Sequence, residues 1–259
     1  MKLKLITLLA FTLIVFGCTK DDDAESTNTN NGVNKNLNRQ ETGSSANAIL
    51  SSNTFKSLVI ELVFIEGFEP TQTAINNLVS FINNTSNKPN GITVQKRAIP
   101  ATGKDTYTIN EIADIERQQR QLYNTDTQIA IWALFVNGKS SNDSNNTVTL
   151  GSAYWNTSFV IYQETIENLS NGPFEPERTL LETTVITHEF GHLLGLTNAG
   201  TDMQNDHEDE EHPRHCNEQD CLMYWAAESG ASISNMSNMN TAPQLDAQCL
   251  ADLKANGGK

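Results

Sequence analysis

Apolar positions in the middle of the chain follow two different periods. Residues 55–65 and 129–136 are apolar on both alternating faces, which is typical of strands that are covered on both sides of a sheet. Apolar residues at helical spacing indicate helices at 71–82 and 109–123, and residues 91–99 return as a strand. The order strand, helix, strand, helix, strand predicts an α/β layer.

The second half of the chain adds two strands and two helices to this pattern. Residues 148–163 fit two strands that break near Asn156. Pro176 and Glu177 suit the first turn of the long apolar helix that follows. A short closing helix is expected at 243–254, where apolar residues again recur at helical spacing.

The long helix carries the most specific motif of the chain, at residues 183–196. His188 and His192 are four residues apart, so their imidazoles project from one face and can share a metal ion. Glu189 places a carboxylate beside that metal, where it can accept a proton from a metal-bound water. Two neutral imidazoles with an adjacent carboxylate fit Zn²⁺ best, and Gly195 is expected to end the helix.

A third ligand is expected further along the chain, because a catalytic zinc ion usually has three protein ligands and one open position. The remaining histidines are His207, His212 and His215. Cys216 and Cys221 lie in the same segment.

The sequence HEFGHLLGL, followed by His215, Cys216, Cys221 and Met223, resembles the metzincin metallopeptidases and most of all their archaemetzincin branch. This resemblance implies that His215 is the third zinc ligand and that Met223 is the Met-turn residue beneath the metal. It implies an α/β (α+β) fold: a metzincin-like mixed sheet with an antiparallel edge strand, a backing helix, a central active-site helix and a small C-terminal subdomain. Residues 151–155 are the candidate edge strand, which either pairs with an extended substrate over the cleft or is an ordinary strand.

Two features depart from the archaemetzincin pattern. The position six residues after His192 is Asn198, a poor zinc ligand, and residues 198–214 form an apparent insertion. His215 is therefore the preferred third ligand, His207 the runner-up and Asn198 the third choice. The pattern also has a Cys-x-x-Cys pair that completes a second, all-cysteine zinc site, but only Cys249 remains downstream here, so one zinc ion is expected.

The N-terminal region is expected to lie outside the folded domain. Residues 1–17 read as a secretory signal, and the run that ends at Cys18 resembles the lipobox of bacterial lipoproteins. Residues 18–52 have few large apolar side chains and predict a disordered tether. The metallopeptidase domain is placed at 53–259, with an upper subdomain at 53–196 and a lower one at 197–259. These features predict a protein held to the outer membrane or cell surface by lipid on Cys18.

Charge and cysteine content restrict the partners. The formal net charge of −14 argues against binding of nucleic acid. The expected protein is a monomer that acts on protein or peptide substrates. The acidic residues at 202–211 offer oxygen ligands for Ca²⁺ but lack the spacing of a calcium loop, so a solvated acidic face is favoured. A disulfide is possible between Cys216 and Cys221, and a pairing of Cys249 stays open.

These observations predict a lipid-anchored, extracytoplasmic zinc endopeptidase in which Glu189 assists attack of a zinc-bound water on a peptide bond. The alternative is a surface lipoprotein that binds a partner or a glycan and keeps a structural, non-catalytic metal. The retained Glu189 argues against the alternative, because a structural site needs no base and is commonly closed by a fourth ligand.

Overall fold

The computed structural model describes residues 29–30, 33–144, 148–232, 236–237 and 239–259 of the chain. The expected signal at 1–17 and the expected lipid site at Cys18 lie outside the described residues. Within those residues, none of the helices combines the length and the apolar character that crossing a lipid bilayer requires.

A five-stranded mixed sheet with the order β4-β3-β6-β9-β8 forms the centre of the molecule. Four neighbouring strands run parallel, and the edge strand β8 runs antiparallel to β9. The bounds of the strands are β3 Ser57–Ile65, β4 Ile92–Ile99, β6 Gln128–Val136, β8 Gly151–Trp155 and β9 Ser158–Tyr162. The predicted mixed sheet with an antiparallel edge strand is confirmed.

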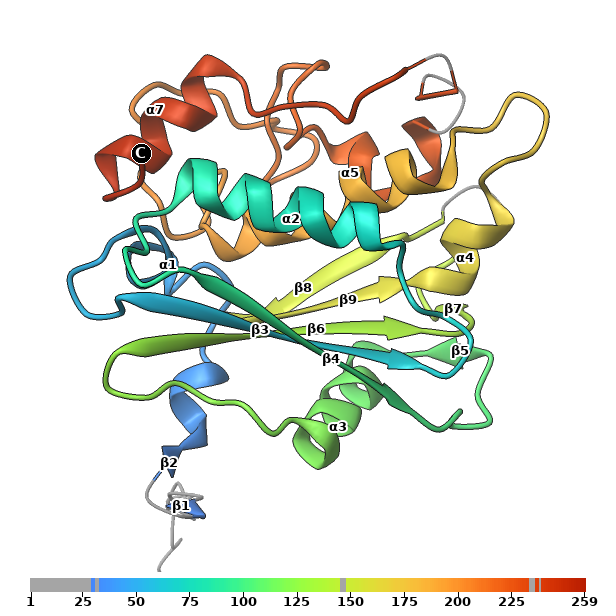
Figure 1. Cartoon of the computed structure of the whole chain (residues 1–259). Helices are drawn as coiled ribbons and strands as arrows, with labels where there is room; N and C mark the ends of the chain where they lie inside the picture. Colours follow the sequence, from blue (N-terminus) through green and yellow to red (C-terminus); the bar gives the residue numbers. More distant parts are fainter. Residues whose placement is uncertain (1–28, 31–32, 145–147, 233–235, 238) are drawn as a thin grey trace, which may run out of the picture.

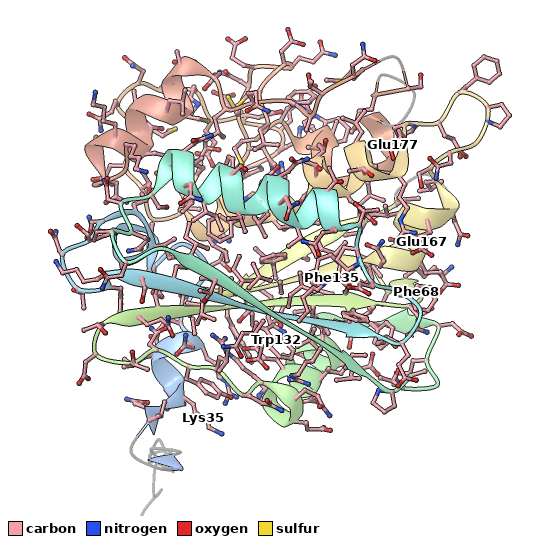
Figure 2. All side chains as sticks on the ribbon, viewed as in Figure 1. Lys35, Phe68, Trp132, Phe135, Glu167 and Glu177 are labelled. Atoms are coloured by element: carbon pink, nitrogen blue, oxygen red, sulfur yellow. The ribbon has the colours of Figure 1, made fainter. Side chains whose placement is uncertain are left out.

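Helices cover both faces of this sheet. Figure 1 shows α2 and α5 above the sheet and α3 below it. Phe135 and Trp132 of β6 are both fully buried and belong to the cores on opposite faces (Figure 2). Burial on both faces explains why these strands are almost continuously apolar. The main helices are α2 Gln72–Thr85, α3 Ile109–Gln119, α4 Gln163–Asn168 and α5 Arg178–Leu193.

The C-terminal part of the chain lies on the same side of the sheet as α2 and α5 (Figure 1). Its described residues form the 3₁₀ helices η2 (Trp225–Glu228) and η3 (Gly230–Ser232) and the closing helix α7 (Ala247–Ala255). The remaining elements are short: β1 Thr29–Asn30, β2 Val33–Asn34, η1 Lys35–Asn38, α1 Ala46–Leu50, β5 Thr106–Tyr107 and β7 Lys139–Ser140.

The predicted helix at 109–123 ends early, at Gln119. The carboxylate of Glu61, which is buried on β3, accepts hydrogen bonds from the backbone N–H groups of Gln121 and Leu122. These bonds satisfy a buried charge and hold the chain in an extended path after the helix. Periodicity alone could not reveal this, because the partner lies far away in the sequence. Helix α4 was not predicted.

The prediction of a disordered tether up to residue 52 is wrong for its second half. Helix α1 buries Ala46, Ile49 and Leu50 in the core that lies under α2 and α5. Lys88 donates hydrogen bonds to the carbonyls of Ala48 and Phe55, at 2.8 and 3.0 Å, and to that of Ser51. A few apolar side chains and one buried ammonium group fix this segment, although its average composition is polar.

Replacing Leu50 with alanine is expected to destabilise the protein by about 2–5 kcal/mol, because the side chain is fully buried and leaves a cavity. Leu37 is the matched control: it is 55% exposed, and its replacement by alanine should change stability by less than about 0.5 kcal/mol. Urea denaturation of both variants measures the difference. Equal and small effects would restore the tether interpretation.

Candidate active site

Helix α5 carries the histidine motif through the core. Its N-terminus is capped by Glu177, whose carboxylate accepts a hydrogen bond of 3.0 Å from the N–H of Leu180. Gly195 follows the helix with a φ of +76°, and a Cβ atom there would lie 2.6 Å from the backbone nitrogen of Thr201. Only glycine fits this close approach, which ends the helix as the sequence predicted.

His188 and His192 present their Nε2 atoms to the same point, 3.2 Å apart. The Nδ1 atom of His188 lies 2.7 Å from the carbonyl oxygen of Leu222, so Nδ1–H donates to this acceptor and Nε2 keeps its lone pair. His188 is fully buried and His192 is 7% exposed. Burial lowers the pKa of His192 to about 4, which keeps the imidazole neutral and able to bind a metal.

His215 reaches the same point from the C-terminal part of the chain. Its ring centroid lies 5.3 Å from that of His188 and 5.1 Å from that of His192. The N–H of Thr197 donates a 3.2 Å hydrogen bond to the carbonyl of Arg214, so the two ends of the 198–214 insertion meet. The insertion therefore begins and ends close to the C-terminal end of α5. This places His215 next to His188 and His192.

Glu228, at the end of η2, completes this cluster. Its Oε1 atom lies 3.3 Å from Nε2 of His215, and its Oε2 atom lies 3.7 Å from Nε2 of both His188 and His192. The four residues offer one ligand atom each, all within 4.8 Å of one another. Burial raises the pKa of Glu228, but the close approach of the three imidazoles outweighs it and holds the pKa well below its usual range.

The donors of this cluster fit a zinc ion. Three imidazoles and a carboxylate are ligands that zinc binds readily. Zinc bonds of 2.0–2.2 Å at the corners of a tetrahedron separate the ligand atoms by about 3.3–3.6 Å, close to the separations observed here. Nε2 of His215 is buried without a hydrogen-bond partner, a state that a bound metal would relieve.

Glu189 lies beside the cluster and is fully buried. Neither of its carboxylate oxygens has a hydrogen-bond partner. Burial, and then the negative charge of Glu228, raise the pKa of Glu189 well above its ordinary value. The edge strand β8 passes close by, since a Cβ atom on Gly151 would lie 2.6 Å from Oε1 of Glu189.

Met223, the predicted Met-turn residue, is fully buried and packs against α5. A Cβ atom on Gly191, which stands between the two helix histidines, would lie 2.3 Å from its Sδ atom. The carbonyl of Met223 accepts a 2.8 Å hydrogen bond from the N–H of Cys216, directly after His215. This bond links Met223 to the residue that follows His215.

The other candidates for the third ligand lie elsewhere. Asn198 is exposed, and its side-chain amide donates a 3.1 Å hydrogen bond to Glu208. His212 contacts the carboxylate of Asp209 at 3.0 Å and stacks on Trp225. The carboxylates of Glu208 and Asp209 are therefore engaged by neighbouring residues of the same surface segment.

His207 belongs to a second group of possible metal ligands with Cys216, Asp246 and Cys249. Its Nδ1 atom lies 3.3 Å from Sγ of Cys216, and its Nε2 atom lies 2.7 Å from Oδ2 of Asp252.

Cys221 joins this second group through Cys249, with 3.7 Å between their sulfur atoms. Hydrogen bonds from the thiols of Cys216 and Cys249 lower the pKa of Cys221 to about 3, which favours a thiolate. All three cysteines are free, so the possible disulfide between Cys216 and Cys221 is not formed. The three thiols therefore lie near one another and near His207 without a disulfide.

Sequence reasoning missed Glu228, Asp246 and Asp252 in these clusters. Glu228 follows Met223 by five residues and belongs to no motif that we used. Asp246 and Asp252 lie near Cys249 on either side, and this local concentration of metal-binding residue types was the available signal.

The structure is similar to archaemetzincin from Methanopyrus kandleri, with a TM-score of 0.52 and 15% sequence identity over 78% of this chain and 96% of that chain. Metalloproteinase-II from Bacteroides fragilis has a TM-score of 0.42 and 13% identity, over 87% of this chain and 58% of that chain. No family model and no curated protein matches the sequence. The similarity to the archaemetzincin structure shows that the chain has an archaemetzincin-like fold around its histidine cluster.

Proposed function

We propose that this chain is a zinc-dependent endopeptidase. The observation that carries the proposal is the convergence of His188, His192 and His215 beside the buried carboxylate of Glu189. The similarity of the fold to archaemetzincin supports it. Lipid anchoring through Cys18 and an extracytoplasmic location stay predictions of the sequence.

The three histidines would hold the metal through their Nε2 atoms. When bound, zinc would supply a Lewis acid that activates water and polarises a substrate carbonyl. Glu189 takes the proton from the attacking water and passes it to the leaving amine. Its place on α5 directly after His188, with neither carboxylate oxygen engaged by a hydrogen bond, suits this double role.

The edge strand β8 would position the substrate. It lies at the border of the sheet and approaches Glu189 at Gly151. An extended peptide that pairs with a sheet edge gains backbone hydrogen bonds without any demand on its side chains. Such pairing would carry a scissile carbonyl past Glu189.

The alternative function, a binding lipoprotein with a structural metal, is favoured by one observation. Glu228 gives the histidine cluster a fourth protein ligand, and structural zinc sites commonly have four. The buried Glu189, which has no hydrogen-bond partner, has no evident use in a purely structural site.

The two functions differ in a direct assay. The purified protein is expected to cleave casein or members of a broad peptide library, to lose this activity with 1,10-phenanthroline and to regain it with added zinc. A protein that holds zinc at this site but cleaves none of these substrates would favour the structural role.

We also propose a second, structural metal ion held by His207, Cys216, Asp246 and Cys249, whose ligand atoms all lie within 4.8 Å of one another. The expectation of one zinc counted cysteines only, whereas His207 lies where a fourth donor is needed. Asp252 would orient His207 from behind, as carboxylates commonly do for metal-bound histidines. Oδ1 of Asp246 caps α7 by accepting a 2.7 Å hydrogen bond from the N–H of Cys249, whereas Oδ2 lies 3.5 Å from Sγ of Cys216 and is available to a metal.

A further inference from the structure

We propose that Glu228 is a fourth, displaceable ligand of the active-site metal, which holds the peptidase in a resting state. This inference rests on the proposed function. Glu228 lies within 3.3–3.7 Å of the Nε2 atoms of all three histidines, at distances that match the edges of a zinc tetrahedron. With a metal bound, its carboxylate would fill the position that a catalytic site keeps for water or substrate.

The backbone that carries Glu228 is fixed. The N–H of Leu150 donates a 2.8 Å hydrogen bond to the carbonyl of Glu228, and the N–H of Gly230 donates one of 3.1 Å to the carbonyl of Val148. Ala226 and Ala227 are buried beneath the segment. Residues 228–230 therefore lie along residues 148–150, which lead into the edge strand. This pairing places the carboxylate of Glu228 at the histidine cluster.

The side chain of Glu228, in contrast, can turn toward solvent. It is 29% exposed, whereas His188 is fully buried, so Glu228 reaches the cluster from the solvent side. Rotation of the side chain would move its charge into water without moving the backbone. Because the ionised carboxylate would then be hydrated, its departure from the cluster would not leave an unpaired charge of Glu228 buried.

The arrangement also favours displacement by substrate. Gly151 of β8 approaches Glu189, so a peptide that pairs with this strand would bring its carbonyl to the place that Glu228 occupies. Substrate binding and opening of the site are then one exchange, in which a neutral carbonyl or water replaces a carboxylate.

The test compares Glu228→Ala and Glu228→Asp with the wild type and with Glu218→Ala, which removes an exposed carboxylate of the same part of the chain. Each protein is loaded with Zn²⁺ or Co²⁺. For Glu228→Ala we expect the zinc dissociation constant to rise at least about 10-fold, as the loss of a ligand should cost no less than the loss of an outer partner. The visible absorption of the Co²⁺ form should change because the coordination changes.

Activity is measured at saturating zinc. The kcat/KM of Glu228→Ala should rise on the order of 10-fold, since no fraction of the enzyme remains closed. Glu228→Asp, which keeps the charge on a shorter side chain, should give intermediate values in all three measurements. Glu218→Ala should match the wild type.

The outcomes separate this inference from the proposed function. Unchanged zinc affinity and Co²⁺ absorption, with cleavage intact, would overturn the inference alone. Altered metal properties with a loss of activity would make Glu228 a required group and overturn its displaceable role. Altered metal properties without cleavage by any of the proteins would overturn both proposals and leave Glu228 as the fixed ligand of a structural site.

Discussion

Replacement of Glu189 by alanine is expected to lower kcat by about 10²–10⁴-fold while the protein keeps its active-site zinc. The carboxylate lies beside the histidine cluster but is not one of its four ligand groups. Its removal takes away the proton acceptor and leaves the metal donors in place. Steady-state kinetics on a cleaved peptide, together with metal analysis of the same preparation, measures both effects.

Stability gives a control for this variant. Both carboxylate oxygens of Glu189 are buried without a partner, so the substitution breaks no hydrogen bond. The melting temperature should therefore not fall as it would for the loss of a bonded buried group. Full activity in Glu189→Ala would reject the proposed mechanism, and loss of zinc would show that Glu189 acts as a ligand instead.

The motif on α5 was predictable because its information is local. The spacing of His188 and His192 places both imidazoles on one helix face whatever surrounds the helix. The strands of the sheet were predictable for a similar reason, since burial on both faces leaves a continuous apolar run at residues 129–136. Gly195 also marked the end of the helix correctly.

Contacts between distant parts of the chain were harder to foresee. The end of α3 depends on Glu61, almost sixty residues earlier, and the order of α1 depends on Lys88 and on a core that α1 enters. Glu228 reaches the cluster because its backbone pairs with Leu150. None of these contacts leaves a periodic or compositional signal near the residues that they fix.

For the 198–214 insertion, too, local features could be predicted from the sequence and long-range contacts could not. The sequence indicated that it separates two parts of one site, and the resemblance favoured His215 over His207. What the sequence could not give was the closure between Thr197 and Arg214, or the use of His207 beside the cysteines. Both depend on how the inserted segment folds back on itself.

The two histidines are expected to respond in opposite ways to replacement. His215→Ala removes a donor of the active-site cluster, so zinc affinity at that site should fall by more than about 100-fold, the upper end of the effect of losing an outer partner. Activity should be lost with the metal. His207→Ala should keep the active-site metal and its activity, because His207 contacts Cys216 and Asp252 instead.

Co²⁺ substitution identifies which metal is lost. A thiolate bound to Co²⁺ gives strong near-ultraviolet absorption, which should persist in His215→Ala and weaken in His207→Ala. His207→Ala should also be less stable by about 1–3 kcal/mol, since the buried carboxylate of Asp252 loses its partner. His212→Ala is the matched control, because this partly exposed histidine belongs to neither cluster and should leave both metals bound. Equal and normal zinc retention in His215→Ala and His207→Ala would reject the assignment of both sites, whereas a loss of activity in His207→Ala with its stability intact would make His207 the third ligand.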